Sequence, residues 1–202
     1  MKKLILIRHG QTDFNEQRRY SGYSNIPLNN AGIDQATRLR AKARRHTIDR
    51  IYSSDLMRAY QTARIIFGKR RVTKKRYLRE IDFGQMEGLT ADMITERFPS
   101  QYKIWLDTPH LARMPGGESI AAFSARVWKC FEDIRKKNSG KSVAIVSHGG
   151  PIRIILLGLM GKTIGDFWKI QQRNTAFNLV KFAQGAPKFI ALNDITHRND
   201  AS

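Results

Sequence analysis

The chain has 202 residues, a length that suits one domain with its own hydrophobic core. Its single cysteine, Cys130, excludes an internal disulfide and is typical of a reducing compartment, so a cytoplasmic protein is expected. No apolar stretch approaches the roughly 20 residues that a membrane span needs, and no membrane association is expected.

The charge balance is strongly basic, with 36 Lys and Arg residues against 17 Asp and Glu residues and a formal net charge of +19. Such a surface attracts anions: nucleic acid, acidic lipid or a phosphorylated small molecule. Much of the excess lies in residues 38–45, where the bases surround a helix, and 69–79, which has the single aromatic residue Tyr77 and not the interleaved aromatics of a stacking platform. Nucleic-acid binding is therefore not expected as the main function, and a basic proteome background is the simpler explanation.

Short apolar or β-branched runs alternate with stretches of helical periodicity. The runs predict strands at residues 3–8, 50–54, 71–77, 142–148, 176–182 and 188–193. This alternation predicts an α/β domain with a mostly parallel sheet. The short AQGAP segment between the last two runs predicts a C-terminal antiparallel hairpin.

Residues 118–137 carry a clear amphipathic helical pattern. The apolar positions of one face follow at steps of three and four: Ile120, Phe123, Val127, Phe131 and Ile134. PGG before the segment and NSG after it punctuate its ends. Cys130 lies near the apolar face and has no reactive partner pattern, so we expect it in the core.

Two predicted strands end in a His-Gly pair, His9-Gly10 and His148-Gly149. Because ligands collect at the carboxyl ends of strands in open sheets, we expect both histidines at one rim. A glycine after each histidine lets the backbone approach a bound group. Pro151 suits the first turn of a helix whose free N–H groups attract anions.

A third strand end points to the same rim. Ser53 and Ser54 are predicted to cap a helix whose first turn carries Arg58. Helical side chains lean toward the N-terminus, so Arg58 can reach the rim beside Arg8. The spacing of Arg58 in the sequence fits an ordinary surface arginine equally well. The convergence of three strand ends on one rim favours a role for Arg58 in a ligand-binding site.

Five segments occur in the order and spacing of one known family: LIRHGQTDFN, SSDLMRAYQTA, LREIDFGQMEG, PGGES and VSHGG. Over nearly its whole length the chain resembles the histidine phosphatase, or phosphoglycerate mutase-like, superfamily. The resemblance implies a three-layer αβα fold in a single domain of residues 1–202, with a small cap segment around residues 85–116. It also implies a metal-independent enzyme without a cofactor, and the five histidines form no metal-ligand motif.

The resemblance implies that His9 is the nucleophile and forms a phosphohistidine, which a neutral imidazole can do near pH 7. Arg8 and Arg58, which can each fork onto two phosphate oxygens, and a protonated His148 would offset the phosphate charge. Asn15 matches a phosphate-contacting position. Gly149 and Gly22 are also expected to bind phosphate or substrate.

The general acid is placed by resemblance at Glu80. A carboxyl group beside a phosphate dianion favours its protonated form, as general acid catalysis requires. Glu87, seven residues further along, is the alternative. We favour Glu80, with Glu87 as a structural partner or a substrate contact.

The substrate is expected to be a phosphorylated small molecule. Only residues 85–114 separate DFG from PGGES, a shorter insertion than in the mutases, and an open pocket favours hydrolysis over transfer. The segments YSGYSNIPLNNAGIDQA, LREIDFGQMEGLT, PGGES and SHGGPIR, the last of which ends at Arg153, resemble the α-ribazole phosphatases most. They imply hydrolysis of α-ribazole 5′-phosphate in cobalamin biosynthesis.

Several alternatives stay open. Asn25 stands where aspartate is common in that group, and residues 100–115 match no substrate pattern. A broad-specificity or sugar-phosphate phosphatase shares every catalytic position. A phosphoglycerate mutase-type phosphotransferase and a non-catalytic binder of anions or nucleic acid are the remaining alternatives, and the sequence does not indicate the oligomeric state.

Overall fold

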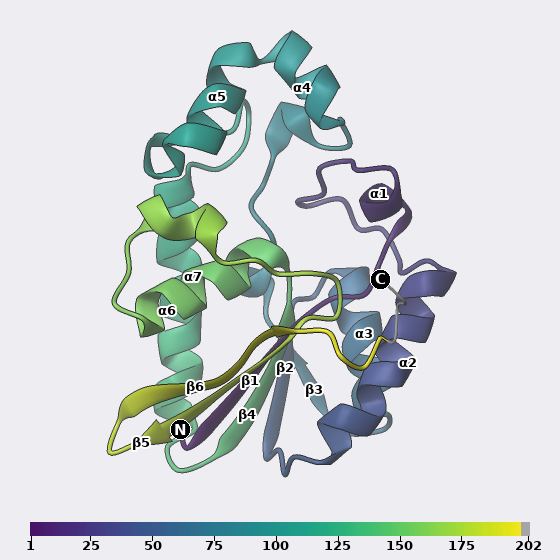
Figure 1. The fold of residues 1–202 in the computed structure, drawn as a ribbon, viewed down its shortest axis with the longest axis vertical. Helices are drawn as coiled ribbons and strands as arrows, with labels where there is room; N and C mark the ends of the chain where they lie inside the picture. The colour runs from purple at the N-terminus through teal and green to yellow at the C-terminus, as the bar shows by residue number, and fades with distance from the viewer. Residues whose placement is uncertain (199–202) are drawn as a thin grey trace.

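A six-stranded sheet forms the centre of the protein. In the computed structural model, which describes residues 1–198, the strand order is β3-β2-β4-β1-β5-β6 (Figure 1). The strands are β1 (Lys3–Arg8), β2 (Arg50–Ser53), β3 (Val72–Lys74), β4 (Ser142–Ser147), β5 (Phe177–Ala183) and β6 (Ala186–Asp194). The first four run parallel, and β5 pairs antiparallel with both β1 and β6. The mostly parallel sheet and the C-terminal hairpin are both confirmed.

Helices cover both faces of the sheet. The α-helices are α1 (Asp13–Glu16), α2 (Asn30–Arg44), α3 (Met57–Phe67), α4 (Ala91–Arg97), α5 (Pro99–Asp107), α6 (Ile120–Lys137) and α7 (Gly149–Leu159). Four 3-10 turns complete the described elements: η1 (Arg76–Leu78), η2 (Gly84–Met86), η3 (Pro109–Leu111) and η4 (Ile164–Lys169). Along β1, Ile5 and Ile7 pack against α2 and α3, whereas Leu4 and Leu6 face α6 and α7. The three-layer αβα architecture is confirmed.

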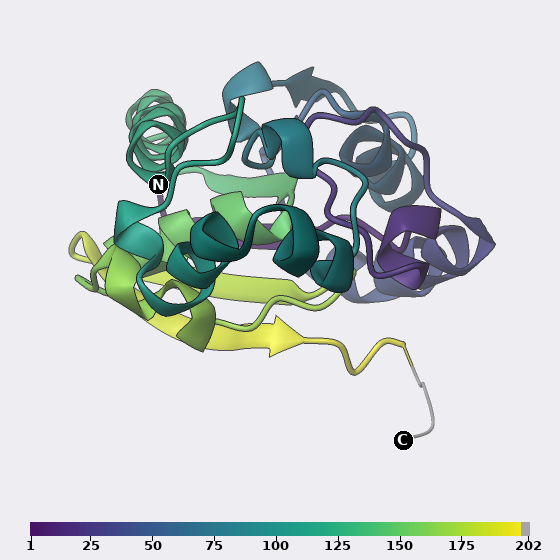
Figure 2. The ribbon, with the colours of Figure 1, turned by 90° about the horizontal axis from the view of Figure 1, so that it is seen from above.

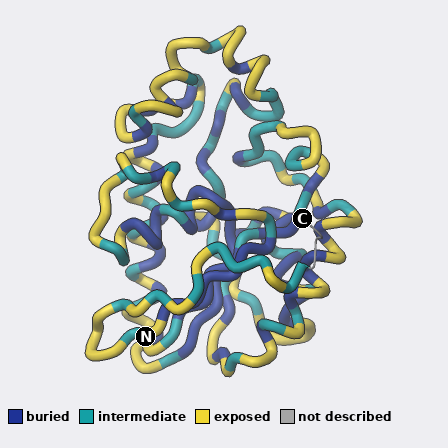
Figure 3. Tube along the Cα trace, in the orientation of Figure 1, coloured by how far each residue is buried: buried dark blue, intermediate teal, exposed yellow. Residues whose placement is uncertain are grey.

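The sheet and the helix faces that touch it make up the core (Figure 3). Every residue of β4 is buried, because β4 lies between β2 and β1 and has helices on both faces. The predicted amphipathic helix is α6, and each of its five apolar positions is buried. Cys130 is also buried in that core, as predicted.

The edge strand β3 is shorter than the predicted run of residues 71–77. It spans Val72–Lys74 and is followed by η1. The Lys75 N–H donates to the Ser53 carbonyl, and β2 ends at Ser53. Beyond Lys75 the edge strand therefore has no backbone partner, and the chain turns.

The predicted caps of the helix that carries Arg58 are wrong. Helix α3 begins at Met57 with Leu56 at the N-cap, and neither Ser53 nor Ser54 occupies that position. The Met57 N–H instead donates to Asn25 Oδ1 at 2.7 Å. Ser54 Oγ lies 2.9 Å from the His148 ring, so the strand end supplies a site contact and a distant loop caps the helix.

Helices α4 and α5 lie beyond the carboxyl ends of the parallel strands, as the two perpendicular views show (Figures 1 and 2). The Trp168 indole of η4 donates to the Trp105 carbonyl of α5 at 2.9 Å. This bond ties the pair of helices to the segment that follows α7. None of the helices within residues 1–198 is long and apolar enough to cross a membrane.

Candidate active site

His9 stands at the end of β1 and is almost fully buried. Its backbone N–H donates to the Ser147 carbonyl of β4 at 2.9 Å, which fixes the residue at the rim. Its Nδ1 lies 2.7 Å from the Gly10 carbonyl oxygen. Because a carbonyl can only accept, Nδ1 carries the hydrogen and Nε2 carries the lone pair.

His148 meets His9 at this rim, as the strand-end pattern predicts. It follows β4 and stands at the N-cap of α7. The two ring centroids are 5.1 Å apart at an interplanar angle of 62°. Burial, and then the positive charge of Arg58, holds the pKa of both imidazoles well below 6.5, so both rings are neutral at pH 7.

Arg8 and Arg58 carry two buried guanidinium groups next to these rings. Burial lowers the pKa of each to about 10, so both are charged at pH 7. Arg8 Nη1 donates to the Gln172 carbonyl at 2.6 Å. Arg58 donates from both terminal nitrogens to the carbonyls of Ser21, Gly22 and Ser24. The expected two-pronged grip on phosphate therefore does not describe Arg58, whose terminal nitrogens already bind the loop.

Three buried nitrogens at the rim lack a hydrogen-bond partner within residues 1–198: Arg8 Nε, Arg58 Nε and His148 Nδ1. Buried polar atoms are normally paired, so three unpaired nitrogens beside one neutral imidazole need an explanation. An anion seated among them would satisfy all three. Arg8 Nε also lies close to Gly149, the first residue of α7: a Cβ added to Gly149 would be 3.8 Å from this nitrogen.

Asn15 faces the same space from helix α1. Its Oδ1 accepts from the Thr12 N–H and from Asn174 Nδ2. Because both neighbours donate to this oxygen, the amide NH₂ group of Asn15 remains available to the pocket. Asn174 also donates to the His9 carbonyl. No signal in the sequence marks Asn174, because its contacts are more than 150 residues away along the chain.

Glu80 lies at the other side of the rim. Its Oε2 accepts from the Gly150 N–H at 3.0 Å, and its Oε1 accepts from the Ile81 N–H at 3.1 Å. A Cβ on Gly150 would lie 2.1 Å from Glu80 Oε1, so a side chain at that position would displace the carboxylate. The second glycine of the SHGG motif thus gives Glu80 its place.

Glu87 and Gly22 do not line the pocket but contact each other. Both Glu87 oxygens accept from the Gly22 N–H, and Oε1 also accepts from the Ser24 N–H. Arg58 binds the carbonyls of the same loop. Glu87 and Arg58 therefore hold the loop from its two sides, the structural partnership considered for Glu87.

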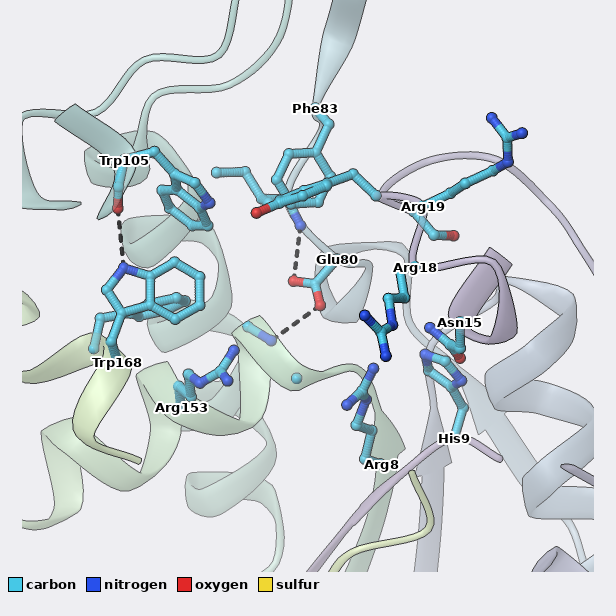
Figure 4. Close-up of a pocket in the computed structure, with 16 residues that line it drawn as sticks. Arg8, His9, Asn15, Arg18, Arg19, Glu80, Phe83, Trp105, Arg153 and Trp168 are labelled. Carbon is cyan, nitrogen blue, oxygen red and sulfur yellow. Dashed lines mark hydrogen bonds between the residues drawn. The ribbon is translucent and has the colours of Figure 1, made fainter. Parts of the chain in front are cut away.

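A cavity of about 310 Å³ opens at the rim, and the buried side chains of Arg58 and His148 lie behind its lining (Figure 4). Arg8, His9, Asn15 and Glu80 line it together with Gly149. One wall is aromatic and contains Tyr20, Phe83, Trp105, Phe167 and Trp168. Three further arginines line it: Arg18, Arg19 and Arg153.

Sequence reasoning assigned no role to this aromatic wall or to Arg18 and Arg19. Arg153 was noted only as part of a resemblance, and its guanidinium lies 5.1 Å from the Phe167 ring and 5.0 Å from the Trp168 ring. Arg18 follows helix α1 with a positive φ of 56°, the left-handed region. Arg18 and Arg19 line the pocket from the turn that follows α1.

Arg126 positions the backbone that leads to Glu80. It donates to the carbonyls of Tyr77, Arg79 and Glu80, the last at 2.7 Å. Its guanidinium also forms an ion pair with Glu118 at 2.6 Å. Glu118 belongs to PGGES and accepts from the Asp82 N–H, so that motif supports the carboxylate that enters the pocket.

The pocket thus contains a neutral imidazole with its lone pair free, the buried cation Arg8 and the carboxylate of Glu80, and the buried cation Arg58 lies behind its lining. This donor set does not resemble a metal centre, and no group of three or more His, Cys, Asp and Glu residues that could hold a metal ion occurs among the described residues. The fold and site define an αβα protein whose pocket holds a neutral histidine next to buried positive charge.

Residues 4–195 match the model of the histidine phosphatase superfamily, branch 1. The chain belongs to this superfamily. It is 32% identical over 199 residues to phosphoserine phosphatase 1 of Hydrogenobacter thermophilus, an alignment that covers 98% of this chain and 94% of that protein.

Solved structures share the fold. A phosphoserine phosphatase of Entamoeba histolytica, in complex with 3-phosphoglyceric acid, has a TM-score of 0.88 and 34% identity and covers 98% of this chain and 100% of its own. A structure described as a putative alpha-ribazole-5'-P phosphatase of Escherichia coli has a TM-score of 0.88 and 27% identity, with coverage of 96% and 97%.

Proposed function

We propose that the protein hydrolyses phosphomonoesters through a phosphohistidine on His9. The observation that carries the proposal is the set of three unpaired buried nitrogens, Arg8 Nε, Arg58 Nε and His148 Nδ1, around the His9 ring. They supply donors and two positive charges where a phosphoryl group would stand. Phosphoryl transfer depends mainly on such positioning and charge stabilisation.

In the first step His9 Nε2 attacks phosphorus, the N–P bond forms and the ester P–O bond breaks. The lowered pKa of His9 keeps its lone pair available at neutral pH. If Ser54 donates its hydroxyl hydrogen to His148 Nε2, the neutral His148 ring carries its hydrogen on Nδ1. His148 can then donate to phosphate without becoming protonated, and Asn15 adds its amide NH₂ group.

Glu80 serves as the acid and then as the base. It protonates the leaving oxygen as the ester bond breaks. Its carboxylate then takes a proton from the water that attacks phosphorus, which releases inorganic phosphate and restores His9. Glu80 is favoured over Glu87 for this role because Glu80 lines the cavity, whereas both oxygens of Glu87 are bound by the loop backbone.

The decisive experiment traps the intermediate. Wild-type enzyme is mixed with p-nitrophenyl phosphate in the presence of a chelator, quenched in alkali, and analysed by peptide mass spectrometry for phosphate on His9. His9→Ala should lose hydrolysis by at least about a thousandfold and carry no label. His110→Ala, at an exposed histidine, is the matched control. Normal turnover by His9→Ala would end the proposal.

For the substrate we propose α-ribazole 5′-phosphate, whose flat base would lie against the aromatic wall. Trp105 and Trp168 meet at 4.8 Å between ring centroids, and η4 and α5 hold this pair over one side of the cavity. Aromatic rings of this kind favour a planar apolar leaving group.

Phosphoserine is the second candidate, and two observations favour it. The relative from Hydrogenobacter thermophilus and the structure from Entamoeba histolytica are both named phosphoserine phosphatases and share more identity with the chain than the α-ribazole structure does. Arg18 and Arg153 line the cavity beyond the phosphate position and could pair with a carboxylate.

Steady-state kcat/KM separates the two candidates. If the aromatic wall selects the substrate, Trp168→Leu should lower kcat/KM for α-ribazole 5′-phosphate about 10-fold or more and leave phosphoserine hydrolysis nearly unchanged. A higher kcat/KM for phosphoserine than for α-ribazole 5′-phosphate, together with loss of phosphoserine hydrolysis in Arg153→Leu, would identify phosphoserine as the substrate. A flat profile over sugar phosphates would indicate a broad-specificity phosphatase.

We further propose that residues 85–116 form a small cap on one domain that spans the chain. The segment contains α4, α5 and η3, and its tie to the main body through Trp168 supports this. Hydrolysis is expected over transfer because a short cap leaves water access to the phosphohistidine. With 3-phosphoglycerate the product should be free phosphate, and an isomerised phosphoglycerate would favour a mutase.

A further inference from the structure

The positive charge of the chain is concentrated in one segment. Residues 38–79 contain 15 Lys and Arg residues but only two acidic residues, Asp49 and Asp55, a net charge of +13 out of the +19 of the whole chain. Like charges held together raise the free energy of the folded state by mutual repulsion. Ion pairs of Arg38, Lys42 and Arg79 offset part of this repulsion, and a bound anion would offset more.

Part of this charge lies at the end of the sheet opposite the catalytic rim, whereas Arg58 stands at the rim and Lys75, Arg76 and Arg79 follow the carboxyl end of β3. The connection from α2 to β2 carries Arg45 and leads to Arg50, and the connection from α3 to β3 carries Arg70 and Arg71. Both connections enter the amino ends of parallel strands, whereas His9 stands at a carboxyl end (Figure 1). Basic side chains of helix α2 therefore lie near basic side chains of the connection between α3 and β3.

Two cavities lie between these elements and share Arg70. One, of about 360 Å³, lies between the C-terminal ends of α2 and α3, and the other, of about 570 Å³, follows β2 and β3. We call the combined surface the basic groove, and its cations are Arg40, Arg44, Arg50, Arg70, Arg71 and Lys75. Asp49 also lines it, and its Oδ2 accepts from the Ser142 N–H.

The groove continues around the β3 edge. Tyr52 and Lys75 also line a third cavity of about 300 Å³ against α6, which contains Tyr77, Lys129 and Lys137. The Tyr52 hydroxyl accepts from Asn138 Nδ2, which holds the ring in place, and Tyr77 is 62% exposed. This third cavity is also lined by Arg126 and by one acidic residue, Asp133, so here two aromatic rings stand among cations that outnumber the acidic group.

None of the six groove cations forms an ion pair with another residue of the described chain. Arg40, Arg50 and Arg70 donate instead to the carbonyls of Ile65, Asp49 and Ile48. Carbonyl bonds orient a guanidinium without cancelling its charge. These three side chains are thus held in place and keep their charge, as a binding surface for phosphates requires.

We propose that the basic groove binds single-stranded nucleic acid, with its cations on successive phosphates and Tyr77 against a base. A positively charged groove with neighbouring aromatic rings is the general form of such surfaces. An anionic membrane fits less well, because membrane-surface binding combines cations with apolar side chains that insert. Of the large exposed apolar residues in the described chain, only Tyr77 lines these cavities.

The test measures fluorescence anisotropy of a 5′-labelled 20-nucleotide oligouridylate between 50 and 300 mM NaCl. We compare the wild type with the triple variant Arg50→Gln, Arg70→Gln and Arg71→Gln. The matched control, Lys162→Gln, Lys181→Gln and Lys188→Gln, removes the same charge from exposed positions near η4 and on the β5–β6 hairpin. Hydrolysis of p-nitrophenyl phosphate and thermal unfolding check that each variant is folded.

We expect the groove variant to bind about 10- to 100-fold more weakly at 100 mM NaCl, with the slope of log K against log salt reduced by about two, because each single-strand phosphate contact contributes about 0.7. The control should lose much less, and Arg→Lys at the three positions should restore binding. Equal losses in both triple variants would overturn the proposal. Failure of the wild type to bind the oligouridylate would also overturn the proposal, whether or not the protein binds phosphatidylserine vesicles.

Discussion

At the scale of single residues, the site depends on which atom of each side chain is already bound. The Gly10 carbonyl takes the His9 Nδ1 hydrogen and leaves Nε2 free for attack. The loop carbonyls take the terminal nitrogens of Arg58 and leave Nε. The Gly150 and Ile81 N–H groups each bind one oxygen of Glu80, so the carboxylate faces the cavity from a set position.

Glu80→Gln tests the proposed acid at this scale. The amide cannot protonate a leaving oxygen, so hydrolysis of an alkyl phosphate should fall about 10²- to 10⁴-fold in kcat. p-Nitrophenolate leaves without protonation, and its ester should lose far less. The comparison of kcat for the two substrates is the measurement.

Glu87→Gln is the control for that experiment. Glu87 binds the Gly22 and Ser24 N–H groups and does not line the cavity, so its loss should affect both esters by a similar factor. If Glu87→Gln rather than Glu80→Gln discriminates between the leaving groups, the assignment of the acid is reversed.

At the scale of elements, the loop of residues 21–25 connects helix α3 to the Glu80 segment. Asn25 caps α3 through the Met57 N–H, and Arg58 binds the loop carbonyls from within the same helix. Gly22 lies against the Ile81 carbonyl, where a Cβ would come within 2.2 Å. Movement of this loop would therefore displace both Arg58 and the backbone next to Glu80.

Gly22→Ala should destabilise the protein by about 1–3 kcal/mol, because the added methyl group meets backbone that cannot yield without moving Ile81. It should also lower kcat/KM for every ester. Urea unfolding gives the first quantity and initial rates give the second. Gly165→Ala, whose Cβ would meet only Thr163 Oγ1 at 3.4 Å, should leave both nearly unchanged. A Gly22→Ala variant as stable as the wild type would contradict the packing described here.

At the scale of the whole molecule, the rim places two neutral imidazoles in the interior beside fixed positive charge. His9 and His148 have lowered pKa values in the folded protein, whereas an unfolded histidine titrates near 6.5. Below that pH the unfolded chain binds protons that the folded protein does not. The free energy of unfolding must therefore fall with decreasing pH, and these two groups contribute nothing to this dependence well above pH 6.5.

Between pH 7.5 and 5.5 each histidine should lower the free energy of unfolding by up to about 1.4 kcal/mol, the limit reached by a folded ring that stays neutral over this range, so the pair accounts for at most about 3 kcal/mol. Urea denaturation at the two pH values measures the change. The double variant His9→Asn, His148→Gln should lose most of this dependence. A double variant with the same pH dependence as the wild type would show that other groups are responsible.

Local order along the chain was enough to predict the sheet, the amphipathic helix α6 and the meeting of His9, His148, Arg8 and Arg58. Period-two and period-3.6 patterns report which face is buried, and the topology of a parallel sheet brings strand ends to one edge. The strand predicted at residues 71–77 is present but shorter, at Val72–Lys74, and the serine caps predicted for α3 were wrong, because neighbours distant in sequence decided both. Asn25 caps α3 from the loop of residues 21–25, and β3 ends where its partner strand ends.

The sequence by itself determined the fold class, the superfamily and the residues that gather at the rim. Tertiary structure alone decided which atoms of those residues are free, since carbonyl and N–H partners come from loops far along the chain. It also decided the aromatic wall, the support of Glu80 by Arg126, and the single groove formed by cations of separate elements. These features depend on the distances between segments that are far apart in the sequence. A periodic pattern of apolar residues carries no information about such distances, which are set only when the chain packs.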